Sequence, residues 1–243
     1  MVTWNGIKIA DKGFLINLEK RKDRLDESLK EFEKNNIVGV ERFDAIRLED
    51  EPNFLFLSCA QSHLEILKIQ VKENINKVII FEDDFFFDIC YDPKKEKPNN
   101  VVDTCIKTIN ESEFDLLYLG VCLMSKSEEI NSNLIKPDKT IQTTCYISSL
   151  EFAKYVTETF DFRNKNSLVY GEQIDTFYNV LSSKAHWKME HYFFDKEIII
   201  NNNLKIFSYY PILFNQRYSY SDISNQLTSH SGSNQLRNMK YYP

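Results

Sequence analysis

Three consecutive acidic residues, Glu82, Asp83 and Asp84, are the part of this sequence best suited to chemistry. The apolar run 78–81 precedes them and three phenylalanines follow, so both flanks draw the acids toward the protein interior. An unpaired carboxylate is costly to bury, and a bound cation or a strong hydrogen-bond donor offsets that cost. The run therefore has two interpretations: a divalent-metal site at the end of a buried strand, or an acidic N-terminus of a following helix or turn.

The chemical type of these ligands limits which metal ions could bind. Carboxylate oxygens are hard donors and favour Mn²⁺, Mg²⁺ or Ca²⁺ over zinc. On an extended backbone, Glu82 and Asp84 would share one face and Asp83 would lie on the other. One face could then hold the ion, while the remaining acid accepts hydrogen bonds from a sugar hydroxyl or a backbone amide. The sequence has no glycine-rich phosphate-binding motif, so any phosphate would be bound by the metal and by side chains.

Strand and helix patterns alternate through the first half of the chain, which is typical of a parallel sheet with crossover helices. We expect helices on both sides of that sheet, and a single domain over residues 1–243, because no repeat or linker is apparent. The polar segment 224–243 is expected to be a tail or lid. The expected strands are 13–18, 40–46, 77–81, 114–120, 142–148 and 205–213, and the expected helices are 21–35, a helix opened by a capping box at 58–61, 101–109, 150–160 and 171–182.

Composition limits the class of protein. A net charge of −6 argues against non-specific nucleic-acid binding, which needs a basic face. No apolar run is long enough to span a bilayer, and the first residues lack the pattern of a signal peptide. The five cysteines show no C-x-x-C spacing, which indicates reduced thiols in a cytoplasmic protein. Nothing in the sequence indicates an oligomeric state.

Two arginines and one histidine could also take part in a site. Arg21 and Arg24 lie at the start of the first expected helix, either on a solvated face or positioned to bind a phosphate or nucleotide through paired guanidinium donors. His63 lies within the second expected helix, where it is either a hydrogen-bonded core histidine or a contact to substrate.

Three further candidates lie in the second half of the chain. Glu172 and Asp175, near the start of an expected helix, either favour the helix dipole or provide a general base. His230 lies in the polar tail, where it is either solvated or a third metal ligand brought in when the tail folds over.

Taken in order, short segments along nearly the whole chain resemble glycosyltransferase family 25, which includes bacterial lipooligosaccharide and collagen hydroxylysine galactosyltransferases. Two positions depart from the family pattern: Ser58 stands where glycine is usual, and Gln173 where proline is common. The matching segments are Phe14-Leu15-Ile16-Asn17-Leu18 with Arg21 and Arg24, Glu41-Arg42-Phe43-Asp44-Ala45, Cys59-Ala60-Gln61-Ser62-His63, Ile80-Phe81-Glu82-Asp83-Asp84, Asp115-Leu116-Leu117-Tyr118-Leu119-Gly120, Cys145-Tyr146-Ile147-Ser148, Ile174-Asp175, Pro211, Gln216 and Ser221-Asp222-Ile223.

The resemblance implies a Rossmann-like α/β fold of the GT-A type and transfer of a hexose, galactose or glucose, from a UDP-sugar to a hydroxyl of a glycan or hydroxylysine, with inversion. It implies that Mn²⁺ or Mg²⁺ joins Glu82 or Asp84 to the diphosphate, with His230 or Asp222 as an open third ligand. Further roles follow from the same resemblance: Asn17, Arg21 and Arg24 near the uridine or diphosphate, His63 and Asp83 near the ribose or sugar, and Asp175, then Glu172, as the candidate base.

Two other classes of function compete with this one. A module of the same fold could bind a glycan or nucleotide without turnover, although the intact acid triplet argues against lost metal binding. A metal-dependent phosphodiesterase would need a second cluster of acids or histidines, and the sequence shows no strong one.

Overall fold

The computed structural model describes residues 1–48, 54–90, 100–138, 140–159, 204–217, 219–221 and 226–228. Its helices are α1 (Lys22–Lys34), α2 (Phe54–Lys72), α3 (Val101–Glu111) and α4 (Leu150–Thr159). Its strands are β1 (Val2–Trp4), β2 (Ile7–Ala10), β3 (Lys12–Asn17), β4 (Ile37–Val38), β5 (Val40–Asp44), β6 (Lys77–Glu82), β7 (Phe85–Cys90), β8 (Leu116–Leu123), β9 (Glu128–Asn131), β10 (Leu134–Lys136), β11 (Thr140–Ser149), β12 (Ile206–Tyr209), β13 (Ile212–Gln216), β14 (Ser219–Ser221) and β15 (Gln226–Thr228).

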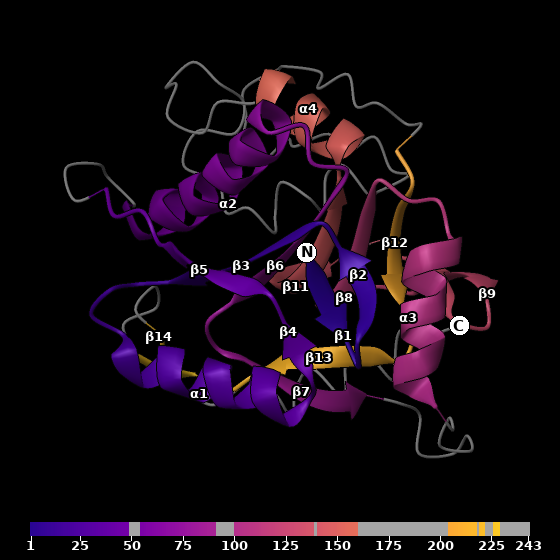
Figure 1. Ribbon diagram of the computed structural model, residues 1–243, viewed down its shortest axis with the longest axis horizontal. Helices are drawn as coiled ribbons and strands as arrows, with labels where there is room; N and C mark the ends of the chain where they lie inside the picture. Colours follow the sequence, from indigo (N-terminus) through magenta and orange to yellow (C-terminus); the bar gives the residue numbers. More distant parts are fainter. Residues whose placement is uncertain are drawn as a thin grey trace.

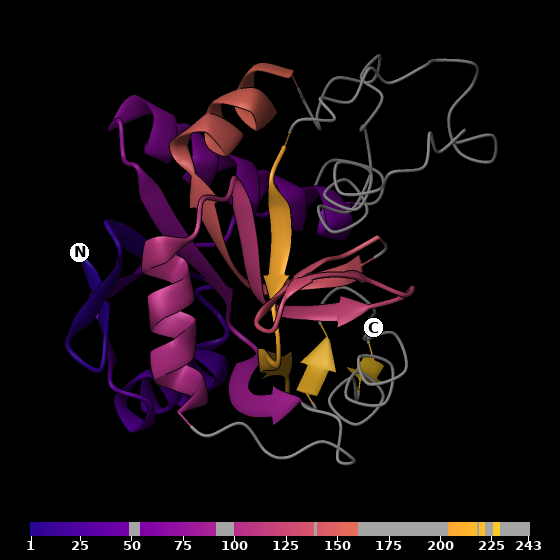
Figure 2. The ribbon, with the colours of Figure 1, turned by 90° about the vertical axis from the view of Figure 1, so that its right-hand side faces the viewer.

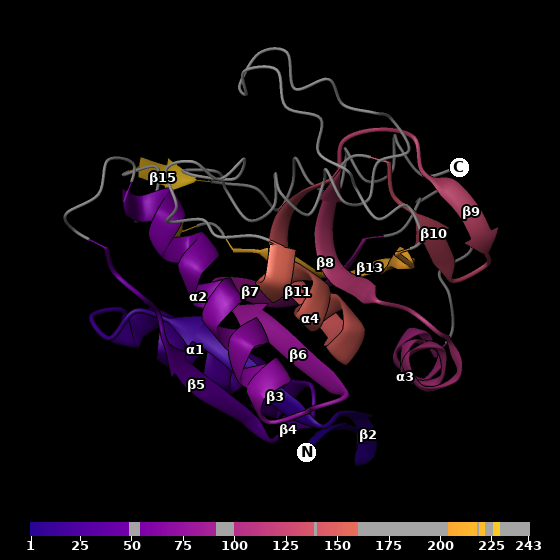
Figure 3. The same cartoon turned by 90° about the horizontal axis from the view of Figure 1, so that it is seen from above.

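An eight-stranded sheet forms the centre, in the order β5-β3-β6-β11-β8-β12-β10-β9. β5, β3 and β6 pair in parallel, and β8 pairs in parallel with β12 (Figures 2 and 3). β11 is antiparallel to both of its neighbours, and so is β10. Six of the eight strands therefore run in one direction, which confirms the expected α/β fold with a mostly parallel sheet.

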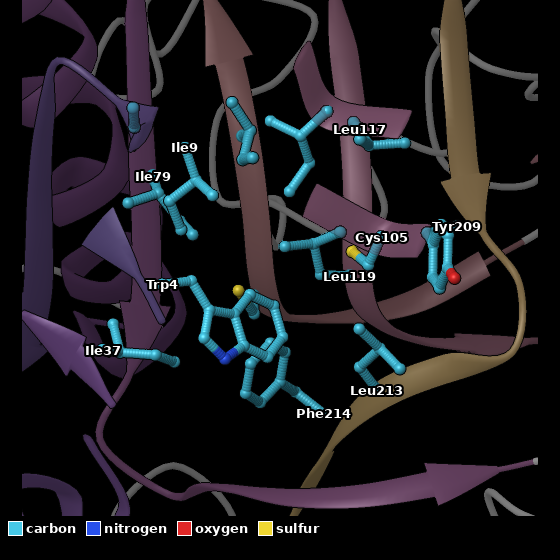
Figure 4. Packing of buried hydrophobic residues seen from close by; sticks show 14 of the residues in the cluster. Trp4, Ile9, Ile37, Ile79, Cys105, Leu117, Leu119, Tyr209, Leu213 and Phe214 are labelled. Atoms are coloured by element: carbon cyan, nitrogen blue, oxygen red, sulfur yellow. The ribbon is translucent and has the colours of Figure 1, made fainter. Parts of the chain in front are cut away.

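Helices cover both faces of this sheet (Figure 1). α2 and α4 pack on one face, over a core that includes Ile80 and Tyr146. α1, α3 and the small sheet β2-β1-β4 cover the other face, where Trp4 packs against Phe214 of β13 (Figure 4). Alternate residues of β6 enter the two cores, so this strand is buried on both sides, as its continuous apolar run predicts. No helix in the described part of the chain has the length and apolarity needed to cross a membrane.

The inner face of α1 differs from the expected one. The spacing of Leu25, Leu29 and Phe32 predicts an apolar stripe along one face of the helix, but Leu29 is 52% exposed. The buried residues of α1 are Arg24, Ser28 and Phe32. The helix presents polar side chains inward at its N-terminal half because that half covers the acidic turn after β6, whose groups accept hydrogen bonds from Arg24 and Ser28.

Two expected boundaries are wrong. α2 begins before the capping box expected at 58–61, and Ser58 lies inside the helix, where its hydroxyl accepts the N–H of Leu48. The strand expected at 205–213 is two strands, because Pro211 has no N–H to continue a ladder. β12 stays in the main sheet, while β13 pairs antiparallel with β7, beside it in Figure 1.

Parts of the second half of the chain lie outside the described residues. The helix expected at 171–182 is among them. Of the tail expected at 224–243, the structure describes only β15, which pairs with β14. The single-domain organisation and the lid role of the tail therefore stay predictions.

Candidate active site

The carboxyl ends of three neighbouring parallel strands place the candidate site. Asn17 ends β3, Asp44 ends β5, and Glu82 ends β6. Their registers bring Asn17 opposite Asp44 and Ile16 opposite Glu82. Ligands of α/β proteins bind beyond this edge of the sheet. The extended backbone expected through the whole acid triplet stops at Glu82, because Asp83 and Asp84 form the turn into β7.

Asp83 has a donor for each carboxylate oxygen. Arg24 Nη1 donates to its Oδ1 at 2.7 Å, and Asn17 Nδ2 donates to its Oδ2 at 2.7 Å. Asn17 is oriented in turn by Arg42, whose Nε donates to the amide oxygen at 3.0 Å. Burial raises the pKa of Asp83, and the charge and hydrogen bonds of Arg24, with the Asn17 amide, offset part of that rise. These contacts make Asp83 a charge that fixes the start of α1 against the sheet edge.

The Glu82 side chain lies on the side of the sheet opposite to α1, between α2 and β11. The Thr143 hydroxyl donates to its Oε1, and Gln216 Nε2 donates to its Oε2 at 3.2 Å. His63 Nε2 lies 3.4 Å from Oε1. Burial alone would raise the pKa of Glu82, but the nearby His63 imidazole, with the Thr143 and Gln216 hydrogen bonds, holds that pKa below its ordinary value. Glu82 is therefore stabilised as a carboxylate.

Asp84 is the acid whose charge is least compensated. Its Oδ2 lies 3.5 Å from Arg24 Nη1, and its backbone oxygen accepts the N–H of Arg217 at 2.7 Å. Its Oδ1 is buried and makes no hydrogen bond with any residue that the structure describes. Burial, followed by repulsion from Glu82, raises the pKa of Asp84 to about 7. The charges of Arg24 and Arg217 therefore offset only part of the cost of ionising Asp84 next to Glu82.

These oxygens fit a hard divalent ion. The Asp84 Oδ1 atom is buried and lacks a partner among the described residues, and Glu82 Oε2, with one hydrogen bond, retains acceptor capacity. Both are carboxylate oxygens, the donor type that Mn²⁺ and Mg²⁺ prefer. A bound cation would relieve the repulsion between the two acids, so Glu82 and Asp84 are suitable ligands.

Arg217 is a site residue that the sequence reading missed. Its Nη2 donates to the backbone oxygen of Asp83 at 3.0 Å and to Ser28 Oγ at 3.3 Å, while its Nη1 pairs with Glu27 at 2.5 Å. The only signal was its position after Gln216, which belongs to a matched segment. The pairing of β13 with β7, which brings it to the turn, has no local signature in the sequence.

The remaining candidates are not all brought to this edge. Arg21 pairs with Asp23 at 2.8 Å, and its charge helps to lower the pKa of Asp83. Glu172, Asp175, Asp222 and His230 lie outside the described residues, so the catalytic base and the third metal ligand stay predictions.

Comparison with known proteins gives relatives of low identity. The chain is 24% identical over 231 aligned positions to procollagen galactosyltransferase 2 of Homo sapiens, and equally to that of Mus musculus. Each alignment covers 84% of this chain and 34% of the relative, so the chain spans about a third of the length of the curated relatives it matches.

A solved structure of a glycosyltransferase involved in glycosylation of the major capsid of PBCV-1 is 13% identical, with a TM-score of 0.35. It covers 64% of this chain and 66% of that chain. A similarity this weak supports no conclusion about the site. The model of glycosyltransferase family 25 (LPS biosynthesis protein) matches residues 10–175, which is more than half of the chain, and the protein therefore belongs to this family.

Proposed function

We propose that this protein is a metal-dependent glycosyltransferase that moves a hexose, galactose or glucose, from a UDP-sugar to a hydroxyl of a glycan or of hydroxylysine. Family membership supports the transferase class, and the names of the curated relatives support galactose as donor sugar and a collagen-like acceptor. The observation that carries the metal requirement is the buried Asp84 Oδ1 beside the Glu82 carboxylate, without a hydrogen-bond partner in the described part of the chain.

In this proposal Glu82 and Asp84 hold Mn²⁺ or Mg²⁺. The bound ion supplies positive charge that offsets the charge building on the departing UDP. His63, Thr143 and Gln216 keep Glu82 ionised, and the hydrogen bonds from Thr143 and Gln216 fix its orientation, so that it presents an oxygen to the ion without rearrangement. Asp83 does not share this task, because Arg24 and Asn17 already occupy both of its oxygens.

The donor nucleotide would lie over the edge formed by β3, β5 and β6. We propose that Asn17, Arg21 and Arg24 border the uridine or diphosphate, and that His63 and Asp83 lie toward the ribose or sugar. The guanidinium groups are suited to a diphosphate because they present paired donors in a fixed plane. Arg24 is held rigidly by Asp83, so little side-chain entropy would be lost on binding.

An inverting transfer needs one base to take the proton of the acceptor hydroxyl. Asp175 is the first candidate for this base and Glu172 the second. Both are assigned from the resemblance of the sequence to the family pattern.

Metal chelation and replacement test this function. Purified protein is incubated with UDP-galactose or UDP-glucose and either a hydroxylysine peptide or a saccharide acceptor, and released UDP is measured. We expect acceptor-stimulated UDP release that stops after removal of divalent ions and returns with Mn²⁺. Release that is unchanged by a chelator would contradict the metal requirement, and generic phosphodiester cleavage without sugar transfer would contradict the transferase class.

A further inference from the structure

A second group of potential metal ligands lies beside the acid triplet. Cys59 and His63 are four residues apart on α2, so both side chains lie on one face of the helix. Glu82 approaches that face from the end of β6. The ligand atoms of these three side chains lie within 4.8 Å of one another, and this is the one such group found among the described residues.

The position of His63 indicates that its ring could coordinate a metal ion. The residue is fully buried, and its Nδ1 lies 2.9 Å from Tyr146 Oη, which fixes the orientation of the ring. Its Nε2 is buried and makes no hydrogen bond with any described residue. That atom is directed toward Glu82, with Nε2 and Oε1 3.4 Å apart. A buried ring nitrogen facing a carboxylate at this distance needs either a proton or a cation between the two groups.

The spacing matches a tetrahedral metal ion. Nitrogen and oxygen atoms that each lie about 2.0–2.1 Å from tetrahedral zinc are roughly 3.4 Å apart. The His63 Nε2 and Glu82 Oε1 atoms are already at this separation. A sulfur ligand would lie roughly 3.6 Å from the nitrogen. Cys59 Sγ is within 4.8 Å, so a small rotation of its side chain completes the set.

The donor types select the ion. A thiolate, an imidazole and a carboxylate form a set that suits Zn²⁺, whereas Mn²⁺ and Mg²⁺ disfavour sulfur. We propose that Cys59, His63 and Glu82 form a zinc site, with water in the fourth position. On binding, the Cys59 thiol releases its proton to solvent and forms the sulfur–zinc bond. In the metal-bound state His63 keeps its proton on Nδ1 and donates it in a hydrogen bond to Tyr146 Oη, which leaves Nε2 free to bind the metal. The site is reachable, since Cys59 is partly exposed and the Glu82 side chain is 19% exposed.

The shared ligand gives this site a regulatory consequence. Glu82 is also a ligand of the catalytic ion in the function proposed above, and the consequence rests on that function. Zinc held by Cys59 and His63 would occupy Glu82 Oε1, in competition with the Thr143 hydroxyl, and would reduce the negative charge that Glu82 offers to the catalytic ion. We therefore expect Zn²⁺ to inhibit Mn²⁺-dependent transfer.

Cobalt absorption tests the site without reference to transfer. Metal-free protein is titrated with Co²⁺, whose bond to a thiolate gives a charge-transfer band, and Zn²⁺ is then added to displace it. We expect one equivalent of Co²⁺ with a thiolate band in the wild type and in Cys122→Ala, a control that removes a buried cysteine elsewhere. Cys59→Ala should lose the band and bind Zn²⁺ at least about tenfold more weakly by calorimetry.

Folding of the variants is checked by thermal melting. Zn²⁺ should raise the melting temperature of the wild type and of Cys122→Ala but not of Cys59→Ala. A wild-type protein without a thiolate–cobalt band, or a band that survives in Cys59→Ala, would overturn the proposal. If the band depends on Cys59 but the protein transfers no sugar, the zinc site stands and the proposed transferase function fails.

Discussion

Asp83 and Asp84 are neighbours in the same turn, yet their surroundings differ in kind. Asp83 receives one charged and one neutral donor at 2.7 Å, from Arg24 and Asn17. Asp84 has a buried Oδ1 with no partner among the described residues, and only a 3.5 Å approach from Arg24 at Oδ2. Both Asp83 oxygens are satisfied by donors of the protein itself, whereas the Asp84 carboxylate would be satisfied only when a cation binds.

The difference indicates that neighbouring acids of one short segment have separate roles, one in stability and one in binding. The Asp83 side chain faces the start of α1 and ties that helix to the edge of the sheet. Asp84 is left next to Glu82, where two carboxylates repel each other. We infer that Asp83 stabilises the fold and that Asp84 is kept for a ligand. Substitutions of the two residues should therefore have opposite effects on stability and activity.

The largest effect is expected for Asp84→Asn on transfer. The amide keeps the size of the side chain but removes a charged ligand, and loss of several kcal/mol of transition-state stabilisation corresponds to at least about a 100-fold loss of rate. Steady-state UDP release with saturating Mn²⁺ measures this. Asp103→Asn, on the exposed side of α3, is the matched control and should keep its rate. Transfer within a few-fold of the wild type in Asp84→Asn would remove the metal role.

Asp83→Ala should instead lower stability by about 3–5 kcal/mol, because it leaves the buried Arg24 guanidinium without its closest counter-charge. Urea unfolding followed by circular dichroism measures the change. Adding Arg24→Met to Asp83→Ala should recover part of the loss, since the double variant no longer buries a guanidinium without its closest counter-charge. An equally small destabilisation by Asp83→Ala and Asp84→Ala would contradict the claim that only Asp83 stabilises the fold.

The pH dependence of stability should also separate them. The folded-state pKa of Asp84 is raised to about 7 from its ordinary value of 3.8, so between these values the folded protein binds the proton more tightly than the unfolded chain. This group therefore makes the metal-free protein less stable as pH rises from about 4 to about 7. Asp84→Asn should flatten that slope and stabilise the metal-free protein at pH 8 by on the order of 2–4 kcal/mol.

Repeating the stability measurement with Mn²⁺ gives a second comparison. Mn²⁺ should stabilise the wild type more at pH 8 than at pH 5 and should not change the stability of Asp84→Asn. Unfolding free energies at several pH values provide the test. A slope that is identical in Asp84→Asn and the wild type would show that Asp84 does not titrate abnormally.

The smallest effect is expected at Thr143, which supports Glu82 from β11. Thr143→Val keeps the shape of the side chain and removes one hydrogen bond to a carboxylate, which contributes about 1.5–3 kcal/mol. We expect lower stability and weaker Mn²⁺ binding, measured by denaturation and calorimetry. Thr144→Val, at the neighbouring buried threonine, should leave Mn²⁺ binding unchanged. Equal weakening by both variants would contradict a specific role for Thr143.

The local features of this site could be predicted from the sequence. The buried strand β6 is visible in its apolar run, and the acids at its end follow directly. Arg24 could be identified as a candidate from its position at the start of the first helix, whereas Asn17 was indicated only by the resemblance to the family. Local patterns of this kind survive in the fold because short-range periodicity decides which residues face the core.

The partners that complete the site come from far along the chain. Arg217 reaches Asp83 from 134 residues away, His63 and Tyr146 are 83 residues apart, and Thr143 lies 61 residues from Glu82. These pairs depend on the position of β11 between β6 and β8 and on the pairing of β13 with β7. Neither arrangement follows from periodicity, so residue type alone gave no role to Thr143 or Arg217.

Calorimetric titration of UDP into the protein, with and without Mn²⁺, tests the central claim most directly. The account predicts UDP binding that depends on Mn²⁺ in the wild type and in Asp103→Asn, and that is lost in Asp84→Asn. UDP binding of equal strength without Mn²⁺, or Mn²⁺-dependent binding that persists in Asp84→Asn, would contradict it.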